Sequence, residues 1–378
     1  NILPNSGYNR YNFTFRDVTK FLKDKLTVDL SASYILQDNK NMIAAGKYFN
    51  PLPALYLFPR GDDFDNVRLY QRWDESRNLY TQAWDYGSGD MSFQNPYWIM
   101  NKMINQTKKR RYMLSANLKY DVTDWLDVTG RVKVDNADMD ITEKRYAGTD
   151  TNFAGEKGMY SIIKRNDRQI YADAIANIDL TFAGDYHLSA NVGASLKDVR
   201  MDFMGWGGDL RKIPNFFSIT NISTTNYKER EDGSHIQSQS IFANVELAWK
   251  SMLYLTVTGR NDWESALAFS KYKSFFYPSV GLSAVVSEMV DMPEWFSFLK
   301  VRGSYSAVGS SYAAYLTKPY YDYKGQTHEW DSLHRFPNEN LKPEKTKSWE
   351  VGLNARFFGG KLNFDATWYR SDTFNQTF

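Results

Sequence analysis

A strict alternation of apolar and other residues over long stretches constrains the fold of this chain more than any other feature. Successive side chains of a β-strand point to opposite faces, so a period of two predicts strands with one apolar face. In residues 112–135 the apolar set is Tyr112, Leu114, Ala116, Leu118, Tyr120, Leu126, Val128, Gly130, Val132 and Val134. The intervening set is Met113, Ser115, Asn117, Lys119, Asp121, Asp127, Thr129, Arg131, Lys133 and Asp135.

The same pattern recurs along the chain and, together with this stretch, predicts about twelve strands. It is present at 28–36, 172–182, 188–197, 241–249, 253–259, 276–286, 299–309, 349–357 and 362–368, with a weaker first segment at 11–15. Many of these segments are longer than the usual five or six residues of a globular strand. Helical periodicity is nearly absent, and a short turn at 293–296 is the exception.

The predicted connections alternate strictly between short and long. Short ones lie at 18–25, 121–124, 183–185, 250–252, 287–295 and 358–360, and long ones at 37–109, 143–165, 200–233, 262–272 and 310–344. In an up-and-down barrel all turns at one end are short, while the loops at the other end can be long. A sandwich with Greek-key crossings has no reason to keep this order.

Aromatic residues gather at the short turns. A ring with a polar handle prefers the level of the lipid headgroups, where one end is dry and the other is wet. We therefore expect a membrane-interface girdle made of Tyr120, Trp125, Phe182, Tyr186, Trp249, Tyr254, Trp295 and Phe357.

Composition excludes several other classes of protein. The chain has 378 residues, a net charge of +2 and no cysteine, so no concentrated basic surface for nucleic acid and no thiolate metal site is expected. The mean hydropathy of −0.56 is that of a soluble protein. A membrane β-barrel also looks polar on average, because lipid-facing and lumen-facing residues alternate.

Lipid is the medium that best explains the apolar set. Backbone groups in hydrocarbon must all be hydrogen-bonded, which only helices and closed barrels achieve. The polar set then lines a wet or plugged interior, with charged residues that include Lys119, Asp127, Arg131, Lys133, Asp179, Glu246, Lys300, Arg302 and Asp365. A lysine at the lipid midplane would cost roughly 2–4 kcal/mol, so this segregation is expected.

Several stretches, in order along nearly the whole chain, resemble the SusC/RagA family of TonB-dependent outer-membrane transporters of Bacteroidetes-type bacteria. They are PNSGYNRYNF (4–13), NPYWIMNK (95–102), GRNDWESAL (259–267), FYPSVGLSAVVSE (276–288), LKVRGSYSAVGS (299–310) and NLKPEKTKSWEVGLNARFFGGKLNFDATWY (340–369). The last is the most specific, because it joins a polar loop end to a strand at a fixed offset.

The resemblance implies an all-β fold: an antiparallel transmembrane barrel of about 22 strands with long extracellular loops and short periplasmic turns. It also implies a plug domain, a TonB-contacting segment and a SusD-like surface lipoprotein that covers the pore. About twelve strands cannot form the whole barrel. We therefore expect residues 1–378 to be part of one barrel domain in the outer membrane, with the plug and the TonB-contacting segment outside this chain.

Aromatic residues of the long loops are the candidate ligand contacts. Such rings stack on sugars or cap peptides, and we name Trp73, Trp84, Tyr97, Trp98, Trp206, Tyr321, Tyr323 and Trp330. The same rings could instead pack the loops themselves or hold the lipoprotein, and NPYW is expected to be a loop-folding element. The glycine-rich stretch 205–217 is expected to form tight turns rather than a phosphate cradle.

No catalytic, metal or cofactor site is predicted. The acidic stretch 61–66 lacks the spacing of a calcium loop and is expected to be a solvated turn. His328 and His334 lack the HExxH spacing of a zinc hydrolase, and no nucleophile elbow is present.

Three functions follow from these observations. The first is a non-enzymatic transporter that imports oligosaccharides or peptides with the lipoprotein and the TonB complex as partners. The second is a secreted, soluble all-β carbohydrate-binding protein or glycoside hydrolase, with the apolar set buried between sheets. The third is a passive outer-membrane pore.

Overall fold

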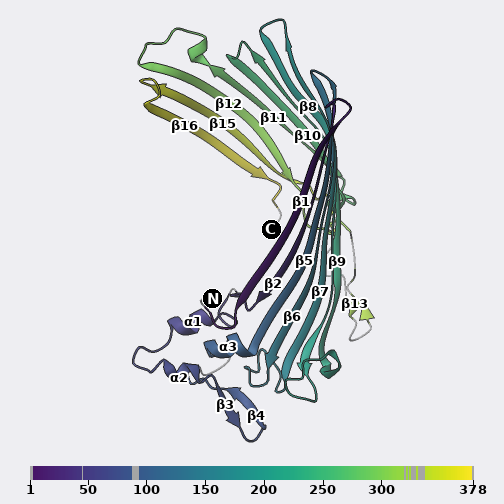
Figure 1. Ribbon diagram of the computed structural model, residues 1–378, viewed down its shortest axis with the longest axis vertical. Helices are drawn as coiled ribbons and strands as arrows, with labels where there is room; N and C mark the ends of the chain where they lie inside the picture. The colour runs from purple at the N-terminus through teal and green to yellow at the C-terminus, as the bar shows by residue number, and fades with distance from the viewer. Residues whose placement is uncertain are drawn as a thin grey trace.

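The computed structural model places twelve strands in a single antiparallel sheet, as the alternation predicts. It describes residues 3–44, 46–86, 93–318, 321, 323–324, 329–330 and 337–376. The strand order is β1-β2-β5-β6-β7-β8-β9-β10-β11-β12-β15-β16, so neighbours in the sheet follow one another along the chain (Figure 1). This is the up-and-down topology of a barrel wall.

The sheet strands are long, and small elements lie in several connections. Three of these are 3₁₀ helices at Ile219–Asn221, Ser265–Leu267 and Val286–Glu288. The sheet comprises β1 (Gly7–Phe21), β2 (Leu26–Lys40), β5 (Met103–Thr123), β6 (Leu126–Tyr146), β7 (Gly158–Phe182), β8 (Tyr186–Leu210), β9 (Ile222–Trp249), β10 (Leu253–Glu264), β11 (Ser274–Val285), β12 (Phe296–Ser310), β15 (Glu344–Phe357) and β16 (Leu362–Phe374). The first long loop contains α1 (Pro51–Tyr56), α2 (Asp65–Arg68), β3 (Gln71–Asp74), β4 (Leu79–Gln82) and α3 (Pro96–Lys102). The hairpin of β13 (Tyr323–Lys324) and β14 (Glu329–Trp330) lies between β12 and β15.

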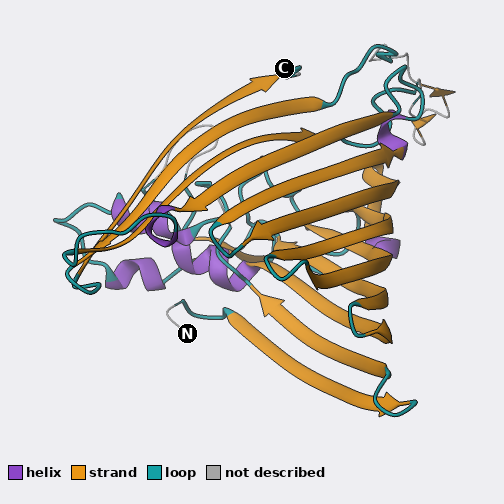
Figure 2. Cartoon of the chain, turned by 90° about the horizontal axis from the view of Figure 1, so that it is seen from above, coloured by secondary structure: helices purple, strands orange, loops and turns teal. Residues whose placement is uncertain are grey.

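The sheet curves into an open trough rather than a closed barrel. β1 and β16 are its two edge strands, and they face each other across the concave side (Figures 1 and 2). All short turns lie at one end, and α1 to α3 with the β3–β4 hairpin lie at the other, which we call the loop end (Figure 1).

The strands extend farther toward the loop end than predicted. β9 begins at Ile222, inside a segment expected to be loop, and pairs with β8 along nearly all of it. The alternation fades there because both faces become polar beyond the apolar band, so the period of two is no longer visible in the sequence. The helices of the first loop were not predicted, since four to seven residues are too few to establish a helical period.

The glycine-rich stretch also differs from its prediction. Gly205 and Gly207 lie in β8 and not in a turn. A Cβ at Gly205 would approach Ile163 Cγ1 to 2.9 Å, and one at Gly207 would approach Ser161 Oγ to 2.8 Å. These glycines therefore allow β7 side chains to lie close over β8.

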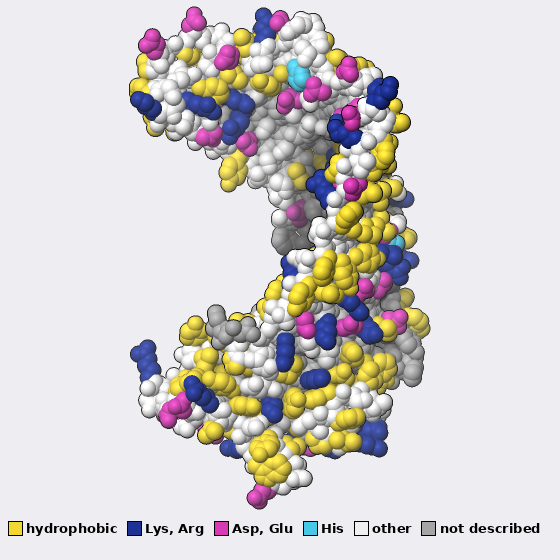
Figure 3. Space-filling model, viewed as in Figure 1, with side chains coloured by type: hydrophobic (Ala, Val, Ile, Leu, Met, Phe, Trp, Pro, Cys, Tyr) yellow, Lys and Arg dark blue, Asp and Glu magenta, His cyan; other side chains and the backbone are white. Residues whose placement is uncertain are grey.

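The outer face of the sheet is apolar along its middle. Cross-strand registers place Leu180, Leu188, Leu247, Leu255 and Leu282 in one row on this face. Hydrophobic side chains gather along the convex edge (Figure 3). Residues such as Leu196 and Ile241 remain 56% exposed, which a water-soluble sheet would not leave uncovered over so large an area.

The inner face is joined by polar contacts between neighbouring strands. Arg131 on β6 donates to Asp173 on β7 in a bidentate pair of 2.7–3.1 Å, and the Asp173 side chain is fully buried. Farther along, Arg260 donates to Asp262 at 2.7 Å and to the hydroxyl of Ser240 at the same distance. These contacts lie on the face opposite the leucine row, so the two sets of the sequence are separated as predicted.

Replacing Asp173 with Ala should lower the free energy of unfolding by about 1–3 kcal/mol. The change leaves the half-buried Arg131 guanidinium without its acceptor. Urea unfolding of the whole protein folded into lipid vesicles measures the loss. Asp29→Ala, which breaks the exposed pair with Arg16, is the matched control and should lose much less. Equal losses of unfolding free energy in both variants would show that burial of the ion pair does not determine its contribution to stability.

Replacing Val192 with Lys should destabilise the whole protein in vesicles by about 2–4 kcal/mol, because this side chain is on the apolar face near the middle of the band. Asn191→Lys changes the adjacent residue, whose side chain is on the inner face, and should cost little. The same unfolding measurement compares them. A smaller loss for Val192→Lys than for Asn191→Lys would show that lipid does not cover this face.

Candidate functional site

A folded cap made of the described residues 41–44, 46–86 and 93–102 lies at the loop end of the sheet (Figure 1). Asn95 caps α3 by accepting hydrogen bonds from the backbone of Tyr97 and Trp98. Its amide donates to the carbonyls of Val67 and Ala83 at 2.9 and 3.0 Å. One buried side chain therefore ties α2, the segment after β4 and α3 together.

Trp98 anchors this cap to the sheet. The ring is completely buried and packs with Ile99 and Met103. Its Nε1 donates to Thr149 Oγ1 at 2.9 Å, in the loop between β6 and β7. NPYW is therefore a loop-folding element, as predicted.

Arg145 on β6 joins the cap to the wall a second time. Its guanidinium donates to the carbonyl of Phe153 at 2.8 Å and to Glu143 at 3.2 Å. The same group lies 4.6 Å from the centroid of the Phe49 ring, a cation–π contact. Phe49 in turn packs edge-on against Phe153, with centroids 5.1 Å apart.

Burial shifts the pKa of two other side chains of the cap. Burial is the main cause that raises the pKa of the Tyr86 hydroxyl, with Asp62 adding to the effect. Burial also lowers the pKa of the Lys102 ammonium, which lies 4.9 Å from the centroid of the Tyr146 ring.

A hollow of about 710 Å³ lies beside the cap at the loop end. Its walls come from β6 to β9 and from the loop between β6 and β7. Charges of both signs line it, namely Glu143, Arg145, Asp209 and Lys228. Glu143, Ser161, Gly207 and Lys228 alternate in phase with Arg131 and Asp173, so the hollow opens on the inner face.

Close backbone approach shapes one side of this hollow. The Gly155 amide donates to Asp209 Oδ1 at 2.8 Å, and a Cβ at Gly155 would lie 2.8 Å from that side chain. Only glycine therefore allows the loop to contact Asp209 here. The hollow offers hydrogen bonds and ion pairs to a ligand that carries both charges.

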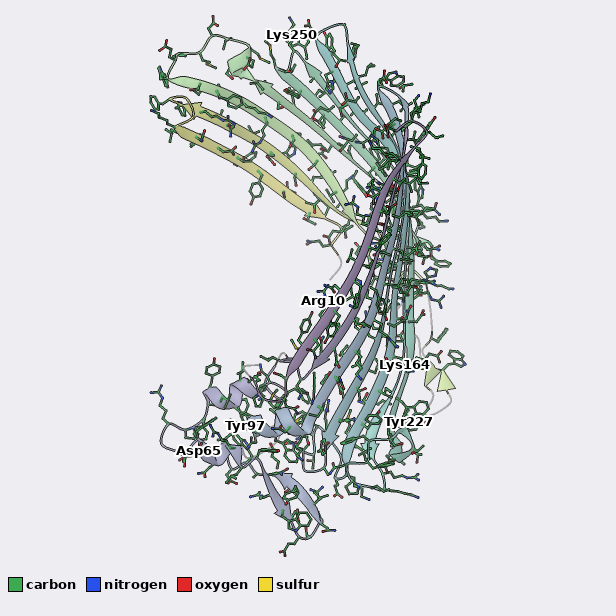
Figure 4. All side chains as sticks on the ribbon, viewed as in Figure 1. Arg10, Asp65, Tyr97, Lys164, Tyr227 and Lys250 are labelled. Carbon is green, nitrogen blue, oxygen red and sulfur yellow. The ribbon has the colours of Figure 1, made fainter. Side chains whose placement is uncertain are left out.

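The predicted aromatic contacts are dispersed rather than gathered. Trp98 is buried, so its prediction as a ligand contact is wrong. Trp73 is 49% exposed and packs on Tyr80 of the β3–β4 hairpin, and Trp84 packs on Tyr86. Figure 4 shows Tyr97 in the cap and Tyr227 elsewhere at the same end, with Lys250 at the short-turn end.

Of the remaining predicted contacts, only Trp206 borders the hollow. It alternates in phase with the outward positions of β8, and its ring stacks on Tyr227 with centroids 5.9 Å apart. Tyr321 and Trp330 are exposed in the loop before β15. The Tyr323 side chain lies outside the described residues. These residues stay predictions as ligand contacts.

The charged residues of the hollow were not predicted as a site. Glu143 and Arg145 fall in a segment that the alternation assigns to a loop, and Lys228 falls in another. Only the register between β6, β7, β8 and β9 brings them together.

The aromatic residues of the predicted girdle lie at the short-turn end. Trp295, Phe296 and Phe357 are stacked, with centroids 4.8–6.1 Å apart, and Phe182 stacks on Tyr186. Tyr120, Trp125 and Trp249 are all partly exposed at this end of the sheet. Tyr254 differs, because it pairs with Ala248 on the inner face and has the Lys300 ammonium 5.8 Å from its ring centroid.

The remaining candidate sites of the sequence are the acidic stretch 61–66 and the pair His328 and His334. In 61–66 the Asp63 carboxylate accepts the backbone N–H of Asp65 at 2.9 Å, the contact of an ordinary acidic turn. Within the described ranges there is no group of three or more side chains suited to hold a metal ion. His328 and His334 lie outside those ranges. None of the helices in the described part of the chain combines the length and apolar character needed to cross a bilayer.

Comparison with known proteins identifies the fold. Residues 55–378 match the family model of the TonB dependent receptor-like β-barrel. TonB-dependent receptor P26 of Formosa agariphila is 24% identical over 388 aligned residues, which cover 98% of this chain and 37% of that protein. The chain thus spans less than two fifths of that relative.

Solved structures contain a sheet with the same fold. The RagAB peptide importer in its open-open state superposes with a TM-score of 0.76 at 16% identity, covering 97% of this chain and 40% of the other. The ferric-catecholate import receptor Fiu of E. coli K12 gives a TM-score of 0.54 at 11% identity, covering 98% and 52%. The resemblance to SusC/RagA transporters and the antiparallel barrel fold are thereby confirmed. The chain belongs to the β-barrel family of TonB-dependent receptors and is an outer-membrane β-barrel protein.

Proposed function

We propose that this chain forms part of the wall and the recognition surface of an active importer. Its ligand is an oligosaccharide or a peptide, held at the loop end beneath a SusD-like lipoprotein and released inward with energy delivered through TonB. The observation that carries the proposal is the hollow beside the cap, lined by both signs of charge on the inner face. The family is one of transporters and not a class of enzymes.

The unpaired edges of the sheet indicate that it belongs to a larger barrel. β1 and β16 each lack a neighbour on one side among the described residues. An unpaired edge in hydrocarbon would leave a row of amides and carbonyls unsatisfied, at several kcal/mol each. We infer that further strands pair with both edges in the membrane and close a plugged barrel.

The family match affects the two alternative functions differently. The soluble lectin or glycoside hydrolase is overturned, because the matched family is an outer-membrane barrel family. A passive pore shares that fold and is distinguished by the energy test below.

The lining of the hollow favours peptides over neutral glycans. Arg145 and Lys228 can pair with carboxylates, and Glu143 and Asp209 can pair with ammonium groups. A peptide carries both groups at its ends. RagAB, whose wall this chain resembles, is itself a peptide importer.

Uptake should depend on energy from the inner membrane. Cells that express the whole protein should accumulate a fluorescent peptide or oligosaccharide mixture, and dissipating the proton gradient or deleting TonB should reduce uptake to the level of cells lacking the protein. Surface binding of the probe should remain. Undiminished uptake without TonB would instead support the passive pore.

Filling the hollow should weaken binding of the probe. Ser161→Tyr places a ring among Glu143, Gly207 and Lys228, and should raise the Kd for a labelled peptide at least on the order of tenfold by excluding ligand atoms. Ser189→Tyr makes the same change on the same face near the short turns and serves as control. Fluorescence anisotropy with the purified whole protein measures both, and equal affinities would remove the hollow from the recognition surface.

A further inference from the structure

A second, smaller cavity of about 210 Å³ lies where the cap meets β5 and β6, and we call it the apolar pocket. Its lining comes mainly from the first long loop, α3 and the loop end of β5. The apolar side chains that line it include Met42, Ile43, Phe49, Ile99, Met100 and Met103. The methionines have unbranched, polarisable side chains, which adapt to groups of different shape.

Most polar groups in the lining of the apolar pocket are already engaged. The Asn41 amide donates to the carbonyl of Met100 at 2.8 Å, and its oxygen accepts the backbone N–H of Asn105 at 3.0 Å. The charged side chains among the described lining residues are Glu143 and Arg145, which pair with each other at 3.2 Å. The pocket therefore carries no net charge and suits a neutral apolar group.

The apolar pocket adjoins the charged hollow. Glu143 and Arg145 line both cavities. A row of cross-strand partners on the inner face runs from the pocket into the hollow across β5 to β8, and it consists of Met103, Arg145, Met159 and Asp209. Three strand spacings of about 4.8 Å separate its ends, so the distance of roughly 14 Å corresponds to about four residues of an extended chain.

The far end of this row offers charge to a ligand. Asp209 accepts the Gly155 amide at 2.8 Å, and Lys228 is exposed on β9. Neither forms an ion pair with another described side chain. A ligand that uses both cavities therefore needs a charged group and, about four residues away, a neutral apolar one. A neutral oligosaccharide supplies neither an ion-pairing group nor an aliphatic side chain.

We propose that the apolar pocket is the specificity site for one bulky apolar side chain of an imported peptide, such as leucine, methionine or phenylalanine. The peptide lies extended across β5 to β8, with this side chain in the pocket and a charged end at Asp209 and Lys228. The inference rests on the proposed import of a ligand held in the hollow. Burial of apolar area supplies the affinity, and the methionine lining accepts side chains of different shape.

Competition binding to the purified whole protein tests this assignment. Octapeptides of glycine and serine with free ends compete with the labelled peptide, and one leucine is introduced at each position in turn. Leucine about four residues from an end should lower the competition Kd at least on the order of tenfold relative to the host peptide, as burial of one such side chain implies. Lysine at the same position should give no gain, because the pocket offers its charge no partner.

A variant that fills the pocket should remove the gain from leucine. Asn105→Phe places a ring in the pocket from an exposed position on β5. Thr107→Phe places the same ring on the same face of β5, outside the lining of both cavities, and should keep the gain. Heat-modifiable migration confirms that each barrel is folded. If Asn105→Phe does not fold, the peptide series with the unsubstituted protein decides alone.

The outcomes separate this inference from the proposed function. If the host peptide competes and Ser161→Tyr weakens it, but leucine adds nothing, the pocket is not a specificity site while the hollow still binds peptide. Equal loss of the leucine gain in Asn105→Phe and Thr107→Phe would also overturn the pocket. If neither the labelled peptide nor any octapeptide binds, both the pocket and the hollow are excluded as peptide sites.

Discussion

Backbone hydrogen bonding in a medium without water is the constraint on which this structure depends. Every amide within the hydrocarbon layer needs a partner, and antiparallel pairing of long neighbouring strands supplies it. Alternation then follows, because each strand must present one face to lipid and the other to the interior. The bidentate pair between Arg131 and Asp173 and the exposed leucine rows are two results of the same requirement.

That requirement also explains what could be predicted from the sequence. Strand number, antiparallel order and the separation of the two faces follow from a period of two wherever one face is apolar. The signal ends where lipid ends, so the alternation predicts loops for the loop-end halves of β8 and β9, which the structure shows as paired strands. Gly205 and Gly207 suggested turns, although they permit close contact with Ile163 and Ser161 across a ladder.

The candidate site was the least predictable part. The aromatic content of the loops singles out Trp98 as a ligand contact, yet its ring is fully buried in the packing of the cap. Arg145 carries no local signal, because its role comes from Phe49 in the first long loop and Phe153 in the loop after β6, which only the fold brings together. Residues that recognise a ligand together through strand register have no motif of their own, and only the paired structure reveals their proximity.

The unequal lengths of neighbouring strands have a consequence for access. β9 has 28 residues, whereas β10 and β11 have 12 each, and their short turns lie at the same end. The loop-end edge of the sheet is therefore uneven, because β7 to β9 extend farther than β10 and β11. A molecule that approaches the loop end therefore meets the projecting ends of β7 to β9 before it reaches the level at which β10 and β11 end.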